Sequence, residues 1–365
     1  MTNVVTGATG FLGLRLVKEL LERGGEVTVL ARPNARPAMV RIAEFLRHSG
    51  YDDDRLTATL ARVRTVDIEL RESRLGLSEE RFRRLADLAE VIWHCGANIA
   101  FSDDPDIIRT NVTGARSMTA LAELGARQPL LCHVSTIAVV GDQQHGMVLE
   151  QEVVDTPRFQ TVYEQSKFEA ERVVCTWAKE HERPTVIFRP SGLISRGPVY
   201  PRCPEHPLQM AVRIGKSILE MFSAFIGERG GMLPLPLVTD DGRANLIPVE
   251  HAAYAMVEAI KRRPPTGLHF YHLVNQDDVP LAMLSEVLGD VFGIKFGPSG
   301  VGSFSSQEFA AAHDFGVYDE LLSRYVGWAT MTRNYEVSGL ADLDLLCPDE
   351  LKVDRQYLLA SVRGA

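Results

Sequence analysis

Short apolar runs alternate with helical patterns along the first 190 residues of the chain. The runs are rich in β-branched and apolar residues, which is typical of buried parallel strands. They occupy 3–6, 26–30, 62–66, 90–94, 130–135 and 185–189. A helical stretch after the first run places Leu12, Leu16 and Leu20 on one stripe and ends at Gly24, and another begins at the capping residue Ser78. Strands alternating with helices predict an α/β fold with a doubly wound parallel (Rossmann) sheet.

The alternation of strand and helix patterns ends after residue 190. A segment crowded with Pro and Gly, "RPSGLISRGPVYPRCPEHP", predicts an extended excursion from the sheet. We expect a helix over about 207–226, a short strand leading into a helix near Val249, a strand over 268–274 and mostly helical structure thereafter. A chain of 365 residues exceeds the usual size of one hydrophobic core. The sequence therefore predicts a Rossmann domain of residues 1–190 and 244–276, and a smaller, mostly helical substrate-binding region of residues 191–243 and 277–365.

Composition and charge narrow the functional classes. The chain is 45% hydrophobic and 24% charged, with a formal net charge of −9, which is typical of a soluble protein without general attraction to nucleic acid or anionic lipid. The N-terminus lacks the basic segment of a signal peptide, and no run of 18 uncharged apolar residues predicts a membrane span. The cysteines are scattered, without the spacing of a disulfide framework or a zinc site. We expect a cytoplasmic protein with no metal, no nucleic-acid partner and no membrane insertion.

The segment "VVTGATGFLG" predicts a dinucleotide site. Its glycines, spaced GxxGxxG, follow the first strand and open a helix. Such glycines permit a tight turn, close approach to a pyrophosphate and close helix–strand packing, and the helix N-terminus supplies free N–H groups. A Gly-rich turn that binds nothing is the weaker alternative, since a strand precedes the motif and a helix follows it. The cofactor-binding residues assigned to this loop are Gly7, Thr9, Gly10, Phe11, Leu12 and Gly13.

The end of the second strand predicts NADPH as the cofactor. An Asp or Glu there would bind the ribose 2′-hydroxyl of NADH, but the chain reads "VTVLARPNAR". Arg32 suits a 2′-phosphate, and Arg36 is a second candidate. The alternative is that Arg32 is simply exposed to solvent.

The segment "TVYEQSKFEAE" predicts a catalytic pair. Thr161 and Glu164 form a capping box, so a helix begins here and carries Tyr163 and Lys167 on one face. A nearby ammonium, with the charge of the oxidised nicotinamide, would lower the pKa of the phenol, which is ordinarily about 10. Tyr163 would then protonate an oxyanion as hydride arrives, and Lys167 would bind the cofactor ribose. The alternative is an ordinary amphipathic helix.

A hydroxyl should complete this site. The fifth strand ends in "HVSTIAVVG", at the crevice where open α/β sheets bind ligands. Ser135 or Thr136 could there hydrogen-bond the substrate oxygen beside Tyr163.

Four motifs together, "TGATGFLG", "STIAVVG", "YEQSK" and "RPSGLISR", resemble the extended short-chain dehydrogenase/reductase family over roughly residues 1–275. In that family's pattern the catalytic hydroxyl lies five residues before the glycine, here Gly141, which selects Thr136 and leaves Ser135 as second choice. The resemblance also implies that Asp67 contacts adenine, and that Asn111 holds the geometry of the active-site helix. Further residues implied to border the cofactor are Ile68, the "HCGA" turn with Gly96 and Ala97, Ser135, Pro190 and Ser191.

One subgroup of this family resembles the sequence best. The segment 75–118 is similar to the thioester reductase domains of nonribosomal peptide synthetases, polyketide synthases and carboxylic acid reductases, and to fatty acyl-CoA reductases. The inserted helical stretch after Arg32 is also usual there. The implied reaction is hydride transfer from NADPH to a thioester, giving an aldehyde and a free thiol, with a further step to the alcohol left open. Because the dinucleotide fold begins at residue 2, we expect the acyl group to arrive in trans, on a carrier protein or coenzyme A.

The helix expected over 207–226 could line an acyl pocket, although plain core is at least as good an interpretation. Its apolar candidates are Met210, Ile214, Ile218, Met221, Phe222 and Phe225. Basic side chains nearby could meet an acidic carrier protein, or could simply be solvated. They are Arg196, Arg202, Arg213 and Lys216.

Two other functions fit the same motifs. A carbonyl, hydroxysteroid, flavonol or sugar-nucleotide enzyme would use the same Tyr163, Lys167 and Thr136. A non-catalytic cofactor-sensing protein would need neither Tyr163 nor Lys167, so their presence argues against it.

Overall fold

The computed structural model describes residues 1–34, 36–100, 104–143, 145–213, 215–216, 232–234, 242–293, 295–297 and 332–363. Within them, a seven-stranded sheet forms the centre of the molecule, with strand order β12-β7-β5-β4-β1-β2-β3 and all neighbours parallel. Its strands are β1 (Thr2–Thr6), β2 (Glu26–Ala31), β3 (Val63–Asp67), β4 (Val91–His94), β5 (Leu130–Val134), β7 (Thr185–Pro190) and β12 (Leu268–Leu273). The predicted Rossmann fold class and all seven strands are confirmed.

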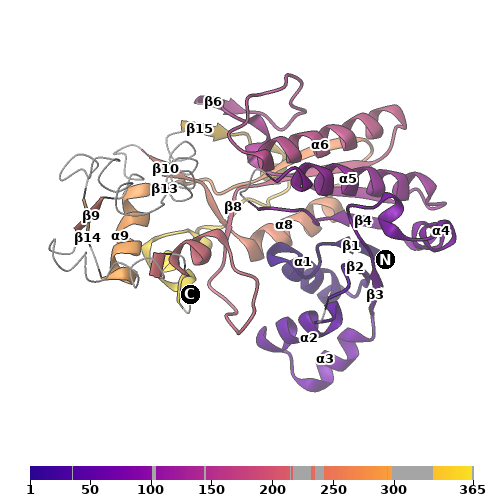
Figure 1. Ribbon diagram of the computed structural model, residues 1–365, viewed down its shortest axis with the longest axis horizontal. Coiled ribbons are helices and arrows are strands. Elements are labelled where there is room, and N and C mark those ends of the chain that lie inside the picture. The colour runs from indigo at the N-terminus through magenta and orange to yellow at the C-terminus, as the bar shows by residue number, and fades with distance from the viewer. Residues whose placement is uncertain are drawn as a thin grey trace.

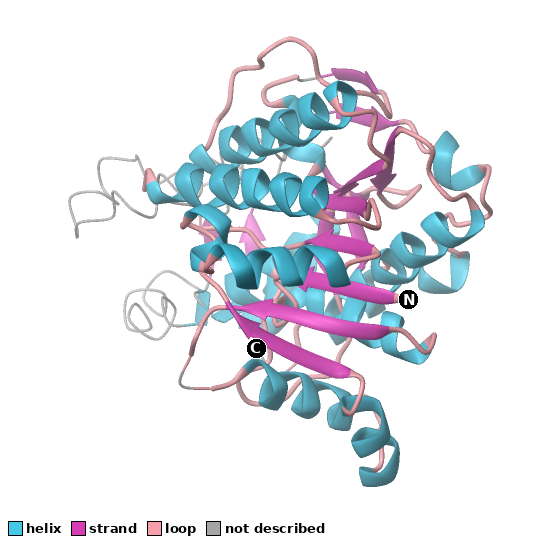
Figure 2. Cartoon of the chain, turned by 90° about the vertical axis from the view of Figure 1, so that its right-hand side faces the viewer, coloured by secondary structure: helices cyan, strands magenta, loops and turns pink. Residues whose placement is uncertain are grey.

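Helices cover both faces of this sheet (Figure 2). One face packs against α1 (Phe11–Glu22), α2 (Ala38–His48) and α8 (Val249–Arg262), and the other against α4 (Glu79–Leu88), α5 (Asp106–Leu124) and α6 (Val162–Glu180). Because both faces are buried, the strands read as apolar runs rather than as alternating patterns. Short helical segments α3 (Asp53–Leu60), η1 (Ser73–Gly76) and η2 (Ile137–Val140) complete this part.

A smaller hydrophobic cluster lies beside the sheet, at the left of Figure 1. It unites α9 (Leu281–Phe292) with α13 (Arg355–Ser361), and its buried members include Ile194, Val287 and Leu358. Short strand pairs accompany it. They are β8 (Gly192–Ile194) with β11 (Leu246–Pro248), β10 (Arg243–Ala244) with β13 (Val279–Pro280), and β9 (Met232–Pro234) with β14 (Lys295–Gly297).

The segment 332–347 returns to the large domain, although the sequence placed it in the substrate-binding region. β15 (Thr332–Tyr335) pairs in parallel with β6 (His145–Val148). After it, α12 (Ser338–Ala341) and the turn that follows bury Leu340, Leu343 and Leu345 in the core of the sheet domain, ahead of η3 (Asp349–Leu351). Apolar residues at this spacing are compatible with either core, so the sequence pattern gives no basis for assigning the segment to one of them.

Candidate active site

The phosphate loop has the geometry that its glycines require. Gly7 has a φ of +66°, and a Cβ there would lie 2.7 Å from the backbone carbonyl of Cys95. A Cβ on Gly13 would lie 2.0 Å from the Gly7 oxygen. Gly10 is the N-cap residue of α1. Because glycine has no side chain, the cap residue provides no acceptor for the N–H groups of the first helical turn. The loop therefore offers N–H groups and close backbone approach to an anion.

Three arginines gather beside this loop, at the end of β2. Arg32 is exposed, and Arg36 pairs with Glu44. Arg41, on α2, donates from Nη2 to the Thr9 carbonyl over 2.7 Å. Burial first, and then the charges of Arg36 and Arg32, lower the pKa of Arg41. The arrangement concentrates positive charge next to the loop, which favours an anionic ligand.

The predicted catalytic residues lie together at the carboxyl end of the sheet. Thr161 and Glu164 form the expected capping box at the start of α6. The Tyr163 hydroxyl is hydrogen-bonded to the side chain of Thr136, which caps η2 just after β5. One turn later on α6, Lys167 donates from Nζ to the Val134 carbonyl over 2.6 Å. The structure thus brings a hydroxyl, a phenol and an ammonium together at the carboxyl end of the sheet.

Burial in the protein works against the lowered Tyr163 pKa that the sequence predicts. Burial raises the pKa of the phenol to about 12, the bond with Thr136 lowers it, and the charge of Glu164 raises it. Lys167 does not counter this burial, because its amine points to the Val134 carbonyl. Tyr163 is consequently a neutral phenol near pH 7, which suits a group that gives up a proton.

Asn111 ties the active-site helix to its surroundings. Its Nδ2 donates to Ser166 Oγ over 2.8 Å and to the Asn98 carbonyl over 3.0 Å, while its Oδ1 accepts from the Asn98 N–H at 2.7 Å. The side chain is 2% exposed and joins α5, α6 and the loop after β4. These bonds are consistent with the role that the family resemblance implies for it.

Two buried serine hydroxyls lack a hydrogen-bond partner among the described residues. Ser135 Oγ and Ser191 Oγ have no hydrogen-bond partner there, although the side chains are 3% and 8% exposed. Leaving a buried hydroxyl unpaired costs free energy, so a ligand or a water is expected to bond it. Both residues directly follow sheet strands at the carboxyl edge, Ser135 after β5 and Ser191 after β7. Together with the crowded glycine loop, they fit a bound dinucleotide.

The other predicted cofactor residues lie along the same edge. Asp67 ends β3 opposite Ala31, and the Ile68 N–H donates to the Ala31 carbonyl over 2.9 Å. The Gly96 N–H donates to Thr6 Oγ1 over 3.0 Å, which places the turn with Ala97 against the phosphate loop. Pro190 ends β7, opposite Leu273.

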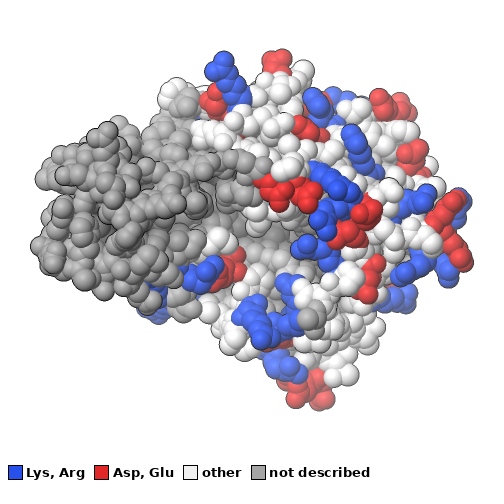
Figure 3. Space-filling view, in the orientation of Figure 1, with Lys and Arg blue, Asp and Glu red and all other residues white. Residues whose placement is uncertain are grey.

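The substrate-side predictions fall partly outside the described residues. Ile214, Ile218, Met221, Phe222 and Phe225 are not described, and Met210 is 40% exposed. Among the basic candidates, the Arg196 guanidinium lies 4.6 Å from the centre of the Tyr357 ring, and Arg213 pairs with Glu205 at 3.1 Å. Charged side chains of both signs are interspersed over the described part of the face in Figure 3, with a basic group in the region of α2.

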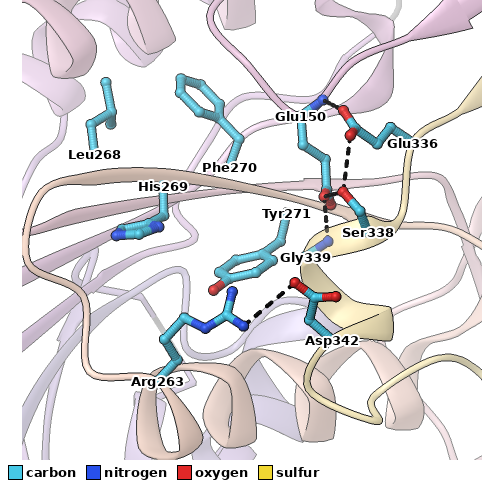
Figure 4. A pocket seen from close by; sticks show the side chains of 10 residues that line it. All are labelled: Glu150, Arg263, Leu268, His269, Phe270, Tyr271, Glu336, Ser338, Gly339 and Asp342. Atoms are coloured by element: carbon cyan, nitrogen blue, oxygen red, sulfur yellow. Dashed lines mark hydrogen bonds and ion pairs between the residues drawn. The ribbon is translucent and has the colours of Figure 1, made fainter.

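A cavity of about 260 Å³ lies elsewhere, along the edge strand β12 (Figure 4). Glu150 projects into it and accepts from the Gly339 N–H over 2.7 Å, and Arg263 points toward Asp342 at 3.6 Å. Its lining contains none of Thr136, Tyr163 and Lys167. This cavity is therefore separate from the residues that carry the predicted chemistry.

Sequence reasoning missed Arg41 and the buried pair of Glu171 and Arg189. Arg41 belongs to a helix whose charges look solvated in the sequence. Arg189 did carry a signal, because a charged residue at the end of an apolar strand needs a buried partner. No described helix is long and apolar enough to cross a membrane, and the described residues contain no cluster of His, Cys, Asp and Glu suited to a metal.

Comparisons with known proteins identify the family and the fold. The model of the Male sterility protein family, an NAD-binding domain, matches residues 5–256. Fatty acyl-CoA reductase 1 of Mus musculus is 32% identical over 149 residues, covering 39% of this chain and 29% of the relative. Nonribosomal peptide synthetase asaC of Aspergillus flavus is 33% identical over 202 residues, covering 52% of this chain and 19% of the relative. The chain thus spans less than a third of either relative.

The terminal R domain from the myxalamid PKS-NRPS biosynthetic pathway shares the fold. Its crystal structure superposes with a TM-score of 0.73 at 23% identity, covering 99% of this chain and 89% of that one. The chain belongs to the Male sterility protein family of NAD(P)-binding oxidoreductases. The fatty acyl-CoA reductase and peptide synthetase relatives are of the kinds that the motif resemblance indicated.

Proposed function

We propose that this protein reduces an acyl thioester to an aldehyde with NADPH, and that the acyl group is held on a carrier protein or on coenzyme A. The observation that carries the proposal is the hydrogen bond between Tyr163 and Thr136, with Lys167 one turn away on the same helix. The fatty acyl-CoA reductase and peptide synthetase relatives support a thioester as the substrate class.

The chain's own groups handle the proton. When bound, the nicotinamide supplies a hydride to the thioester carbonyl carbon. Thr136 and Tyr163 hydrogen-bond the carbonyl oxygen, and the Tyr163 hydroxyl gives its proton to that oxygen as negative charge develops on it. The hemithioacetal then loses its hydroxyl proton as the C–S bond breaks, leaving an aldehyde and a protonated thiol. No enzyme nucleophile is needed, and burial raises the pKa of the Cys95 thiol to about 12.

Particular residues would hold the cofactor. The N–H groups of the loop containing Gly7 and Gly10 suit the pyrophosphate, and Ser135 and Ser191 offer unpaired hydroxyls near the nicotinamide end. NADPH is favoured over NADH by Arg32 and Arg41, because a 2′-phosphate dianion would offset the repulsion that lowers the pKa of Arg41.

The test is an incubation of the purified protein with NADPH and a panel of acyl-pantetheine, acyl-CoA and carrier-bound acyl thioesters. Aldehyde or alcohol is measured by mass spectrometry, and NADPH loss by absorbance. We expect aldehyde in step with NADPH loss, and alcohol if a second hydride transfer follows. Turnover of ketones but of no thioester would show a carbonyl reductase instead, and turnover of neither by a protein that binds NADPH would contradict both enzymatic functions.

A further inference from the structure

The helix α6 carries a buried carboxylate, Glu171, in addition to Tyr163 and Lys167. Glu171 follows Lys167 by one turn of α6, so the two side chains share a face of that helix. They are 3% and 5% exposed, so both charges lie inside the protein. Arg189, on β7, donates to Glu171 twice, from Nη2 to Oε1 over 2.6 Å and from Nε to Oε2 over 3.2 Å. This two-pronged arrangement fixes the carboxylate in orientation as well as in position.

Arg189 is itself held from several sides. It is 0% exposed, and its Nη2 also donates to the Gln151 carbonyl over 2.8 Å. Its guanidinium carbon lies 4.8 Å from the centre of the Phe270 ring, and its Nη1 lies 3.4 Å from His272 Nε2. A planar guanidinium bound in this way has little freedom left to lose. The carboxylate of Glu171 is therefore anchored to the sheet, at one end of the helix turn that carries Lys167.

The other titratable groups that act on Lys167 are uncharged near neutral pH. Burial lowers the pKa of His94 to about 3 and that of His133 well below its usual value. Burial likewise raises the pKa of Cys95, and that of Tyr163 one turn earlier on α6, to about 12 in each case. Imidazole, thiol and phenol are thus all neutral at pH 7.

Glu171 then supplies the charge that favours the ammonium form of Lys167. Burial lowers the pKa of Lys167 to about 8, and Glu171 is the first group that opposes this effect. The Val134 carbonyl at 2.6 Å contributes only a dipole. Without the carboxylate, the amine would lose its proton at a lower pH, because desolvation disfavours the charged form.

We propose that Glu171 is a positioning residue that keeps Lys167 charged, and that Arg189 holds Glu171 in the place from which it does so. The inference rests on the proposed function, in which the Lys167 ammonium serves Tyr163 and the cofactor ribose. It adds two residues to the working site that touch neither substrate nor cofactor.

The first measurement uses the cofactor-free protein and needs no activity. Lysine side chains labelled with ¹³C at Cε are titrated by NMR, and the Lys167 resonance is assigned by its loss in Lys167→Met. We expect a midpoint near pH 8 in the unaltered chain and a midpoint lower by about one pH unit or more in Glu171→Gln. Glu169→Gln is the matched control: it makes the same charge change on the same helix, where Glu169 bonds Gln165. Its Lys167 midpoint should not move.

A second variant tests the inference in case Glu171→Gln does not fold. Glu171→Gln leaves the Arg189 charge buried and unpaired, which is strongly destabilising in general. The double variant Glu171→Leu, Arg189→Met replaces the ion pair by apolar side chains of similar length, a change that proteins tolerate better. It removes the Arg189 cation together with the Glu171 carboxylate, so the Lys167 midpoint should move downward by less than in Glu171→Gln.

An unchanged Lys167 midpoint in the folded variants would overturn the inference. In activity measurements, the alkaline limb of kcat/KM should move to lower pH in Glu171→Gln by the amount seen in the titration, and a purely structural role would lower the rate equally at all pH values. If the midpoint moves but the unaltered chain reduces no thioester, the proposed function fails and the role of Glu171 stands. If thioesters are reduced and the Lys167 midpoint does not move, the proposed function stands and the role of Glu171 is overturned.

Discussion

At the scale of single residues, the site depends on which polar groups the fold leaves neutral. Tyr163 is a phenol whose pKa burial raises to about 12, and Thr136 is bonded to it. A phenol with this pKa is protonated at neutral pH but is a weak acid, so its proton transfer depends on the negative charge that develops on the substrate oxygen. The cation Lys167 lies on the same helix face, one turn away, and does not offset the effect of burial on the Tyr163 pKa.

Replacing Tyr163 by Phe should lower kcat by about 10²–10⁴-fold, the usual contribution of a positioned general acid. The variant keeps the ring and its packing, so NADPH binding should be preserved. Steady-state kinetics and fluorescence titration of NADPH measure the two effects separately. Tyr254→Phe, at a tyrosine on α8 that is 37% exposed, is the control and should behave like the unaltered protein. Undiminished activity in Tyr163→Phe would contradict the proposed mechanism.

Replacing Arg41 or Arg32 by Ala should weaken NADPH binding by about tenfold, because each loses a charged contact to the 2′-phosphate. NADH binding should change little, so the ratio of the two dissociation constants is the informative quantity. Arg55→Ala is a control on α3, away from the loop, where the guanidinium lies over the Tyr51 ring. Equal losses for both dinucleotides would argue that these arginines support the fold and do not select the cofactor.

At the scale of elements, the start of α6 determines where Tyr163 lies. Thr161 accepts from the Glu164 N–H at 3.1 Å, and the Glu164 carboxylate accepts from the Thr161 N–H at 3.3 Å. Both side chains are buried, so the capping box also closes the first turn against the protein interior. Asn111 secures the next turn from α5 through Ser166. The Tyr163 phenol thus lies on a helix that is fixed at two points, the capping box and Ser166.

Thr161→Ala should lower the free energy of unfolding by about 1 kcal/mol, the typical value of an N-cap. Denaturant unfolding followed by circular dichroism measures this change. Thr161→Ser retains the accepting oxygen and should lose much less. If Thr161→Ala lowered kcat with no loss of stability, the cap would act on catalysis alone, against this prediction.

At the scale of the whole molecule, buried neutral side chains make stability depend on pH. His94 and His133 lie side by side on β4 and β5, with ring centres 5.2 Å apart, and His94 Nδ1 is bonded to Thr6 Oγ1 at 2.8 Å. Burial lowers the pKa of His94 from 6.5 to about 3. Between these two values the unfolded chain takes up a proton that the folded chain does not, so acidification favours unfolding.

The stability of the protein should accordingly fall as the pH is lowered from about 6.5 toward 3. His94 alone should contribute about 2 kcal/mol of loss between pH 8 and pH 5. Urea unfolding at several pH values measures the slope, and His94→Asn should reduce that slope by about one proton below pH 6. The absolute stability of the variant does not enter the comparison. An unaltered slope would show that His94 is charged or exposed in the folded protein.

The sequence by itself determined the parallel sheet, the phosphate loop and the pair of Tyr163 and Lys167. These features are local: buried strands, GxxGxxG before a helix, and an i, i+4 spacing after a capping box all depend on residues near one another in the chain. The motif spacing also selected Thr136, whose bond to Tyr163 the structure contains.

Only the tertiary structure decided how charge is distributed around that pair. The raised pKa of Tyr163, the pairing of Glu171 with Arg189 and the approach of Arg41 to Thr9 each join segments far apart in sequence, or depend on how deeply a group is buried. The return of 332–347 to the large core is of the same kind. Burial and long-range contacts set the cost of a charge, and neither can be read from the residues on either side.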